Sequence, residues 1–228
     1  MIRKRLFELY DSEYKRFISP LLPTIPEEKI IGVRMPDIRR LSKEILREGG
    51  SRAFLNDLPH RYYEENNLHA FLIADLPFSE CIAELYAFLP YVDNWGTCDS
   101  LRPTSFKHNR SALLPYIYDW IKNGGVFTKR FAIEMLMMHY LDEDFRQEFF
   151  DMVANTESDD YYLDMMKAWY FATALCKRFE ETVCFIENGR LIPFVKGKAI
   201  SKAIDSKLIS KERKDQLRLL RDKTKKRM

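Results

Sequence analysis

The feature that most limits the fold of this chain is an apolar pattern of helical period, which continues along nearly its whole length. Apolar residues recur at spacings of three and four, whereas the sustained alternation typical of a strand is hard to find. Only eight glycines interrupt 228 residues. Prolines fall mainly between the apolar segments, where helices end or begin. The sequence therefore predicts an all-α chain of about a dozen helices joined by short links.

The order of these helices favours a curved α-solenoid of HEAT-like helix pairs, an α-α superhelix. Successive antiparallel helices without strands build either bundles or α-solenoids, and a degenerate period of about 40 residues fits HEAT repeats. No linker divides the chain, so we expect one domain over residues 1–228. The expected helices cover residues 2–19, 35 to the Gly49-Gly50 pair, 61–75, 78–90, a helix around Trp95 that ends by Pro103, 109–122, 128–141, 142–154, 159–177, 180–188, 196–207 and 210–222.

Composition excludes several classes of protein. Apolar residues make up 46% of the chain, so it should fold, yet no stretch approaches the roughly 18 uninterrupted apolar residues of a membrane span. The basic start Met1–Arg5 precedes Leu6–Asp11 rather than an apolar signal core, which predicts a cytoplasmic protein. The four cysteines form no C-x-x-C pair and the histidines no H-E-x-x-H motif. We therefore expect buried reduced thiols and no metal. We also expect no cofactor and a monomer.

Positive charge is concentrated at the C-terminal end. The net charge is +3, but the segment from Lys196 to the end holds 13 Lys/Arg and 4 Asp/Glu, a net of +9. Such polarity indicates a basic surface that faces a polyanion. The alternative is a lysine-rich, solvated helix.

The stretch Tyr91–Ser100 carries the strongest candidate for chemistry. It places Trp95 four residues before Asp99, so on a helix, which Asp93 or Asn94 could cap, the two side chains would share one face. An aromatic wall beside a carboxylate suits a substrate that carries positive charge. On this pattern alone, the more common arrangement is a tryptophan in the core and an aspartate in solvent.

Several segments together resemble the DNA alkylation repair family of HEAT-like alkylpurine glycosylases, the AlkD-like family. The most specific match is Val92–Asp99, where Trp and Asp stand at the family's spacing, and the similarity continues through the segments Ile30–Arg39, Lys129–Ile133, Asp160–Trp169 and Lys196–Ile200. The resemblance implies a basic concave cleft for duplex DNA carrying alkylated bases. It also implies a monofunctional DNA glycosylase, which excises N3- and N7-alkylated purines without extruding the base into a pocket.

The resemblance also implies roles for individual residues. Asp99 would be catalytic, Trp95 and Trp169 would flank the lesion nucleotide, and Arg130 would fork onto a phosphate. Alternatively, Trp169 is a core residue and Arg130 a surface arginine. Further candidate phosphate contacts, each of which could equally be a solvated lysine, are Lys167, Lys196, Lys198 and Lys202.

Two positions depart from the family's pattern. Asn94 stands where many active members carry a second aromatic residue, and Gly96 stands where a polar helix former is usual. Glycine costs roughly 1 kcal/mol in a helix interior, so we expect a less rigid Trp95–Asp99 helix. Two other functions fit the pattern: a non-catalytic HEAT-repeat protein that binds duplex or branched DNA, and a scaffold for protein interactions.

Overall fold

Every regular element in a computed structural model of the chain, which describes residues 2–225, is helical. The predicted all-α fold class is therefore confirmed. The chain divides into two compact units, residues 1–113 and 114–228, and the division falls inside a helix rather than in a linker. A single domain over the whole chain stays a prediction. Among the described residues, no helix combines the length and the apolar character that crossing a bilayer requires.

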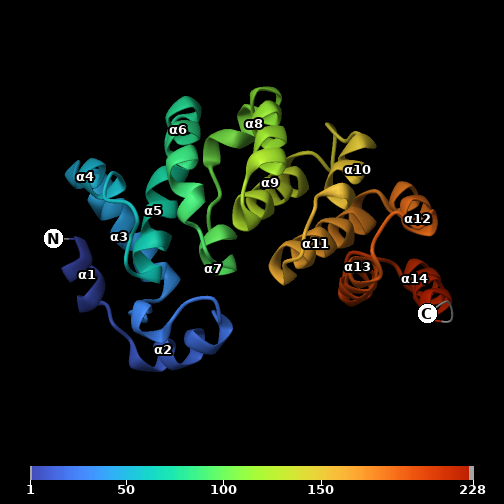
Figure 1. The fold of residues 1–228 in the computed structure, drawn as a ribbon, viewed down its shortest axis with the longest axis horizontal. Coiled ribbons are helices and arrows are strands. Elements are labelled where there is room, and N and C mark those ends of the chain that lie inside the picture. The colour runs from blue at the N-terminus through green and yellow to red at the C-terminus, as the bar shows by residue number, and fades with distance from the viewer. Residues whose placement is uncertain (1, 226–228) are drawn as a thin grey trace. The chain divides into compact units, whose positions relative to one another are not determined.

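The first unit is built around one helix that is buried on all sides. Every residue of α5, Tyr63–Ala74, is buried, and α5 packs against α1, α3, α4, α6 and α7 (Figure 1). A helix with this position has no solvent face, so its polar side chains must find partners inside the protein. The other α-helices that lie wholly in this unit are α1 Ile2–Glu8, α2 Ser12–Ile18, α3 Met35–Glu48, α4 Ser51–Leu55, α6 Phe78–Phe88 and α7 Trp95–Cys98.

The prediction of one helix over residues 2–19 was wrong. Asp11 interrupts it, because its backbone is extended and its carboxylate accepts hydrogen bonds from the N–H groups of Glu13 and Tyr14. An aspartate in this position starts a helix rather than continuing one. Phe7 and Phe17, which lie on either side of the break, are 47% and 63% exposed.

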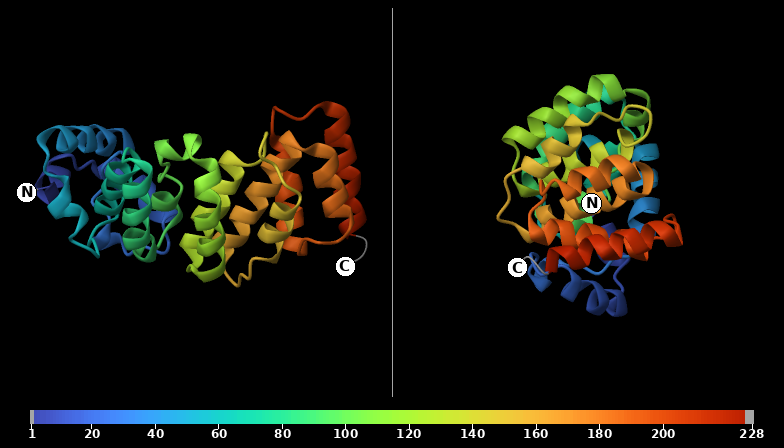
Figure 2. Two further views of the ribbon diagram at one scale, coloured as in Figure 1. Left: turned by 90° about the horizontal axis from the view of Figure 1, so that it is seen from above. Right: turned by 90° about the vertical axis from the view of Figure 1, so that its right-hand side faces the viewer.

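In the second unit, alternate helices stack on one another. α11 packs against both α9 and α13, and the colour order in Figures 1 and 2 shows the same succession. This stacking of every second helix is typical of α-solenoids. α8 Arg110–Asn123 carries the division between the units; the helices after it are α9 Val126–His139, α10 Glu148–Asn155, α11 Tyr161–Lys177, α12 Phe179–Glu187, α13 Pro193–Asp205 and α14 Lys211–Lys225.

Two helices in this unit begin more than two residues away from the predicted position. α10 begins at Glu148 rather than at Asp142. α13 begins at Pro193 rather than at Lys196, because proline is well suited to the first position of a helix, where no intrahelical N–H donor is needed. The thiols also differ in part: Cys81 and Cys98 are buried as expected, whereas Cys176 is half-buried and Cys184 is exposed.

Candidate active site

Trp95 and Asp99 lie at the two ends of a single helical turn. α7 spans Trp95–Cys98, and Asp99 follows it in helical conformation with its N–H donating to the carbonyl of Trp95 at 2.9 Å. The predicted i, i+4 relation is therefore confirmed. Both side chains are half-buried, so the alternative of a core tryptophan and a solvated aspartate describes neither residue.

Asn94 and Gly96, the two departures from the family's pattern, each have a structural role. Asn94 caps α7, since its Oδ1 accepts from the Thr97 N–H at 2.8 Å. Gly96 lies against Tyr63, and a Cβ at Gly96 would be only 2.6 Å from the Tyr63 hydroxyl oxygen. Both residues are therefore fitted to their surroundings, which argues against the less rigid helix that we expected.

The indole of Trp95 is held by contacts within the first unit. Its Nε1 donates to the carbonyl of Leu21 at 2.9 Å, and its ring packs against an apolar cluster that includes Ile18, Leu22 and Tyr63. One polar and one apolar contact fix the ring, as is usual for a tryptophan with one end in solvent. The ring can therefore present a fixed aromatic surface at the start of the turn that Asp99 ends.

Arg130 and Lys167 lie inside the second unit. Arg130 is only 6% exposed and its Nη1 donates to the carbonyl of Tyr162 at 2.6 Å. Lys167 is 4% exposed; its ammonium donates to the carbonyl of Thr156 and lies 3.3 Å from the carboxylate of Asp164. Neither is the solvated cation of the alternative interpretation. A phosphate contact stays a prediction for both.

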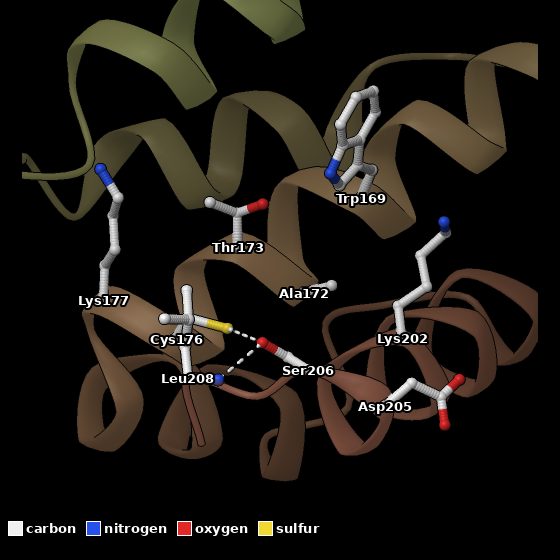
Figure 3. Close-up of a pocket in the computed structure, with 9 residues that line it drawn as sticks. All are labelled: Trp169, Ala172, Thr173, Cys176, Lys177, Lys202, Asp205, Ser206 and Leu208. Atoms are coloured by element: carbon white, nitrogen blue, oxygen red, sulfur yellow. Dashed lines mark hydrogen bonds between the residues drawn. The ribbon is translucent and has the colours of Figure 1, made fainter.

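Trp169 borders an open groove of about 450 Å³ in the second unit. Trp169 is half-buried, and Figure 3 shows its indole beside Lys202, whose ammonium lies 6.0 Å from the centre of the ring. α11 contributes Trp169, Thr173 and Lys177, and the end of α13 contributes Lys202, Asp205 and Ser206. An accessible aromatic face, a cation and hydroxyl groups are suited to a sugar-phosphate chain.

The remaining predicted lysines lie on α13. Lys198 is exposed, with its ammonium 5.7 Å from the centre of the Phe194 ring, and Lys196 is half-buried. Together with Lys202 they give one helix three cations. Trp95 and Asp99 belong to the first unit, and Arg130 and Trp169 to the second, so the common cleft that the resemblance implies stays a prediction.

Sequence analysis missed the residues of α5 that contact the Trp95–Asp99 turn. The Thr97 hydroxyl donates to Oδ1 of Asn67 at 2.8 Å, and Tyr63 packs against Gly96. These partners are about 30 residues apart in sequence, so no local pattern indicates them. The one available signal is the run Glu64–Asn67, four consecutive polar residues in a helix whose other residues are apolar except for His69.

Comparison with known proteins adds one match. A family model described as DNA alkylation repair enzyme matches residues 6–163, well over half of the chain. The matched residues include Trp95, Asp99 and Arg130 but end before Lys167, Trp169 and the lysines of α13. Among curated proteins, none matches.

Proposed function

Because this chain belongs to the DNA alkylation repair enzyme family, we propose that it excises positively charged N3- or N7-alkylated purines from duplex DNA. A role in DNA repair follows from the family itself, and DNA is the substrate that the family implies. The bond that is broken, the lesion and the roles of the residues are our proposal. The observation that supports it is the pair of half-buried side chains, Trp95 and Asp99, at the two ends of one fixed turn.

The charge of the lesion decides what the enzyme must supply. A purine alkylated at N3 or N7 already carries a positive charge, so its ring accepts the electron pair of the N-glycosidic bond and leaves as a neutral base. No general acid is needed for this departure. The sugar is left with positive charge at C1′, as in glycoside hydrolysis. Water then adds to C1′ and loses a proton, which leaves an abasic site in an intact strand.

In this proposal, the negative charge of Asp99 stabilises the positive charge that develops on the sugar in the transition state. A carboxylate about 4 Å from the sugar, at an effective dielectric constant of about 20, stabilises the cation by about 4 kcal/mol. That amount corresponds to roughly a thousandfold in rate. Since the charge develops only as the bond breaks, the interaction favours the transition state over the bound substrate. The electron-rich face of the Trp95 indole would lie against the same nucleotide.

The second unit would hold the DNA backbone. Trp169 offers an apolar face for a deoxyribose, and Lys202 places a cation beside it. Such contacts add affinity and fix the register of the strand but read no sequence. The lysines of α13 extend the same charge along one helix.

Excision can be measured directly. Purified protein is incubated with duplex DNA containing N7-methylguanine, and the released base is quantified by chromatography against a protein-free control. We expect release well above the spontaneous rate, and no strand cleavage until the abasic site is treated with base. Release at the spontaneous rate by folded protein would contradict the proposed activity on this lesion; salt-sensitive DNA binding without release would then favour the non-catalytic binder.

Asp99→Asn separates catalysis from binding. We expect its release rate to fall by about 100- to 1000-fold, while its affinity for DNA is unchanged or slightly higher because one negative charge is lost. Asp93→Asn is the matched control, since it removes the same charge from an exposed residue of the same segment and keeps an Oδ1 that can accept the hydrogen bond from Asn94 Nδ2. Equal loss in both variants would show that the effect is general electrostatics rather than a role of Asp99.

A further inference from the structure

The Trp95–Asp99 turn is too short to maintain its own geometry. α7 has four residues, whereas isolated helices shorter than about 12–15 residues are marginal in water because nucleation is costly. The relative placement of the indole and the carboxylate must therefore come from contacts outside the turn. In the first unit these contacts lead to α5.

A short chain of hydrogen bonds joins the middle of the turn to α5. Asn94 Nδ2 donates to Thr97 Oγ1 at 3.1 Å, and Thr97 Oγ1 donates to Asn67 Oδ1 at 2.8 Å. All three residues are 0% exposed, so water does not compete for these bonds. Because the Thr97 hydroxyl donates in one direction and accepts from the other, its rotamer is fixed against α5.

A steric contact adds to these hydrogen bonds. The hydroxyl oxygen of Tyr63 lies so close to Gly96 that a methyl group there would be 2.6 Å away. Tyr63 is 3% exposed, and burial raises the pKa of its phenol, so the ring stays neutral at this contact. The backbone of α7 therefore cannot move toward α5, and the bond from Thr97 prevents it from moving away.

The same helix holds the segment on which Trp95 packs. The buried carboxylate of Glu64 accepts hydrogen bonds from the backbone N–H groups of Ile31 at 2.9 Å and Gly32 at 2.7 Å. The neighbouring Ile30 belongs to the apolar cluster that the Trp95 ring packs against. The turn that carries Trp95 and Asp99 and the segment on which Trp95 packs are thus both held by side chains of α5.

We infer that Tyr63 and Asn67 are positioning residues for Asp99, which act through Gly96 and Thr97 to fix the carboxylate relative to the Trp95 indole. The inference rests on the proposed function in that Asp99 is taken to act on the substrate. Tyr63 and Asn67 stand four residues apart on α5, so both side chains belong to one face of that helix.

Three threonine substitutions test the inference. Thr97→Val removes the hydroxyl but keeps the shape, and Thr97→Ser keeps the hydroxyl. Thr104→Val is the control for loss of a threonine hydroxyl that donates to α5, since Thr104 Oγ1 donates to the carbonyl of Ala74 at 3.2 Å, but Thr104 is exposed and lies outside the turn. For release of N7-methylguanine, Thr97→Val should lower kcat by about 10- to 100-fold and change KM by less than about twofold. Thr97→Ser and Thr104→Val should stay within about threefold of the native rate.

A second readout does not depend on catalysis. Labelling with 5-fluorotryptophan gives one ¹⁹F resonance for each of Trp95, Trp120 and Trp169, and Trp95→Phe assigns the first. Thr97→Val should shift or broaden the Trp95 resonance, whereas Thr97→Ser and Thr104→Val should leave it in place. If the native protein releases no base, the proposed function fails, and this resonance still decides whether Thr97 positions the turn.

Two outcomes would overturn the inference. One is a Thr97→Ser protein that is as slow as Thr97→Val, and the other is a Trp95 resonance that Thr97→Val leaves unchanged. If circular dichroism shows that Thr97→Val does not fold, Tyr63→Phe takes its place, because it removes a single oxygen atom. We expect that variant to lower kcat by about 3- to 10-fold at unchanged KM; a native kcat would overturn the inference equally.

Discussion

Replacing Gly96 by alanine should destabilise the protein, although alanine is the better helix former. Its Cβ would lie 2.6 Å from the Tyr63 hydroxyl and 3.3 Å from Asn94 Oδ1. Helix propensity favours alanine by about 0.8–1 kcal/mol, whereas overpacking a buried site typically costs about 1–3 kcal/mol. The net expectation is a loss of about 1 kcal/mol in the free energy of unfolding, or about 2–4 °C in Tm for a chain of this length.

Tyr63→Phe removes the atom that the new methyl group would strike. In this background the nearest remaining contacts, to the ring carbon Cε2 of residue 63 and to Asn94 Oδ1, are both 3.3 Å. Gly96→Ala should then be neutral or slightly stabilising. Urea unfolding of the native protein, both single variants and the double variant gives the coupling between the two sites, which we expect to be about 1–2 kcal/mol.

Gly197→Ala provides the control for helix propensity. Gly197 lies inside α13, and no described heavy atom outside its own turn of helix lies within 4 Å of where its Cβ would be. Alanine should therefore stabilise the protein there by up to about 1 kcal/mol. If Gly96→Ala costs the same with and without the Tyr63 hydroxyl, the steric argument for glycine in the turn is wrong.

Acid should weaken the fold through the buried His69. Burial lowers its pKa to about 3, against about 6.5 in the unfolded chain, so only the unfolded chain binds this proton as the pH falls between these values. Stability present at neutral pH is then lost progressively, by about 2 kcal/mol at pH 5; urea unfolding at pH 7.5 and pH 5 measures it, and an equal loss in His69→Gln would contradict the assignment. Separately, Lys202→Ala should weaken DNA binding and reduce the slope of log affinity against log salt by about 0.9, with the release rate at saturating DNA unchanged. The affinity is measured by fluorescence anisotropy across a salt series. Native affinity in that variant would contradict the proposal that the groove beside Trp169 binds the DNA backbone.

The apolar period of the sequence predicted most of the helices, because burial of one face is a local property of a helix, but it did not predict α4. It predicted α3 and α11 to within about two residues, the ordinary uncertainty of helix ends. It failed at Asp11, where apolar spacing continues across a residue whose side chain caps a new helix. Periodicity measures which residues are apolar, whereas a cap depends on one carboxylate and two backbone N–H groups.

The candidate site was predictable only in part. Trp95 and Asp99 are four residues apart in sequence, so their relation on one turn is local and could be foreseen. The burial of Arg130 and Lys167 could not, because it depends on carbonyl groups of Tyr162 and Thr156 that come from other segments. Charge alone suggests a solvated side chain, and only the packed structure shows which cations are satisfied inside the protein.

The departures from the family's pattern are the positions at which this chain ties its turn to its core. Asn94 and Gly96 looked like weaknesses when each was judged by its intrinsic helix propensity. In the structure, Asn94 caps the turn and supports Thr97, and Gly96 allows the close approach of Tyr63. Propensities describe an isolated helix, and a turn of four residues is never isolated. The rigidity that catalysis requires of Asp99 must therefore be sought in α5, the one helix of the first unit that has no solvent face.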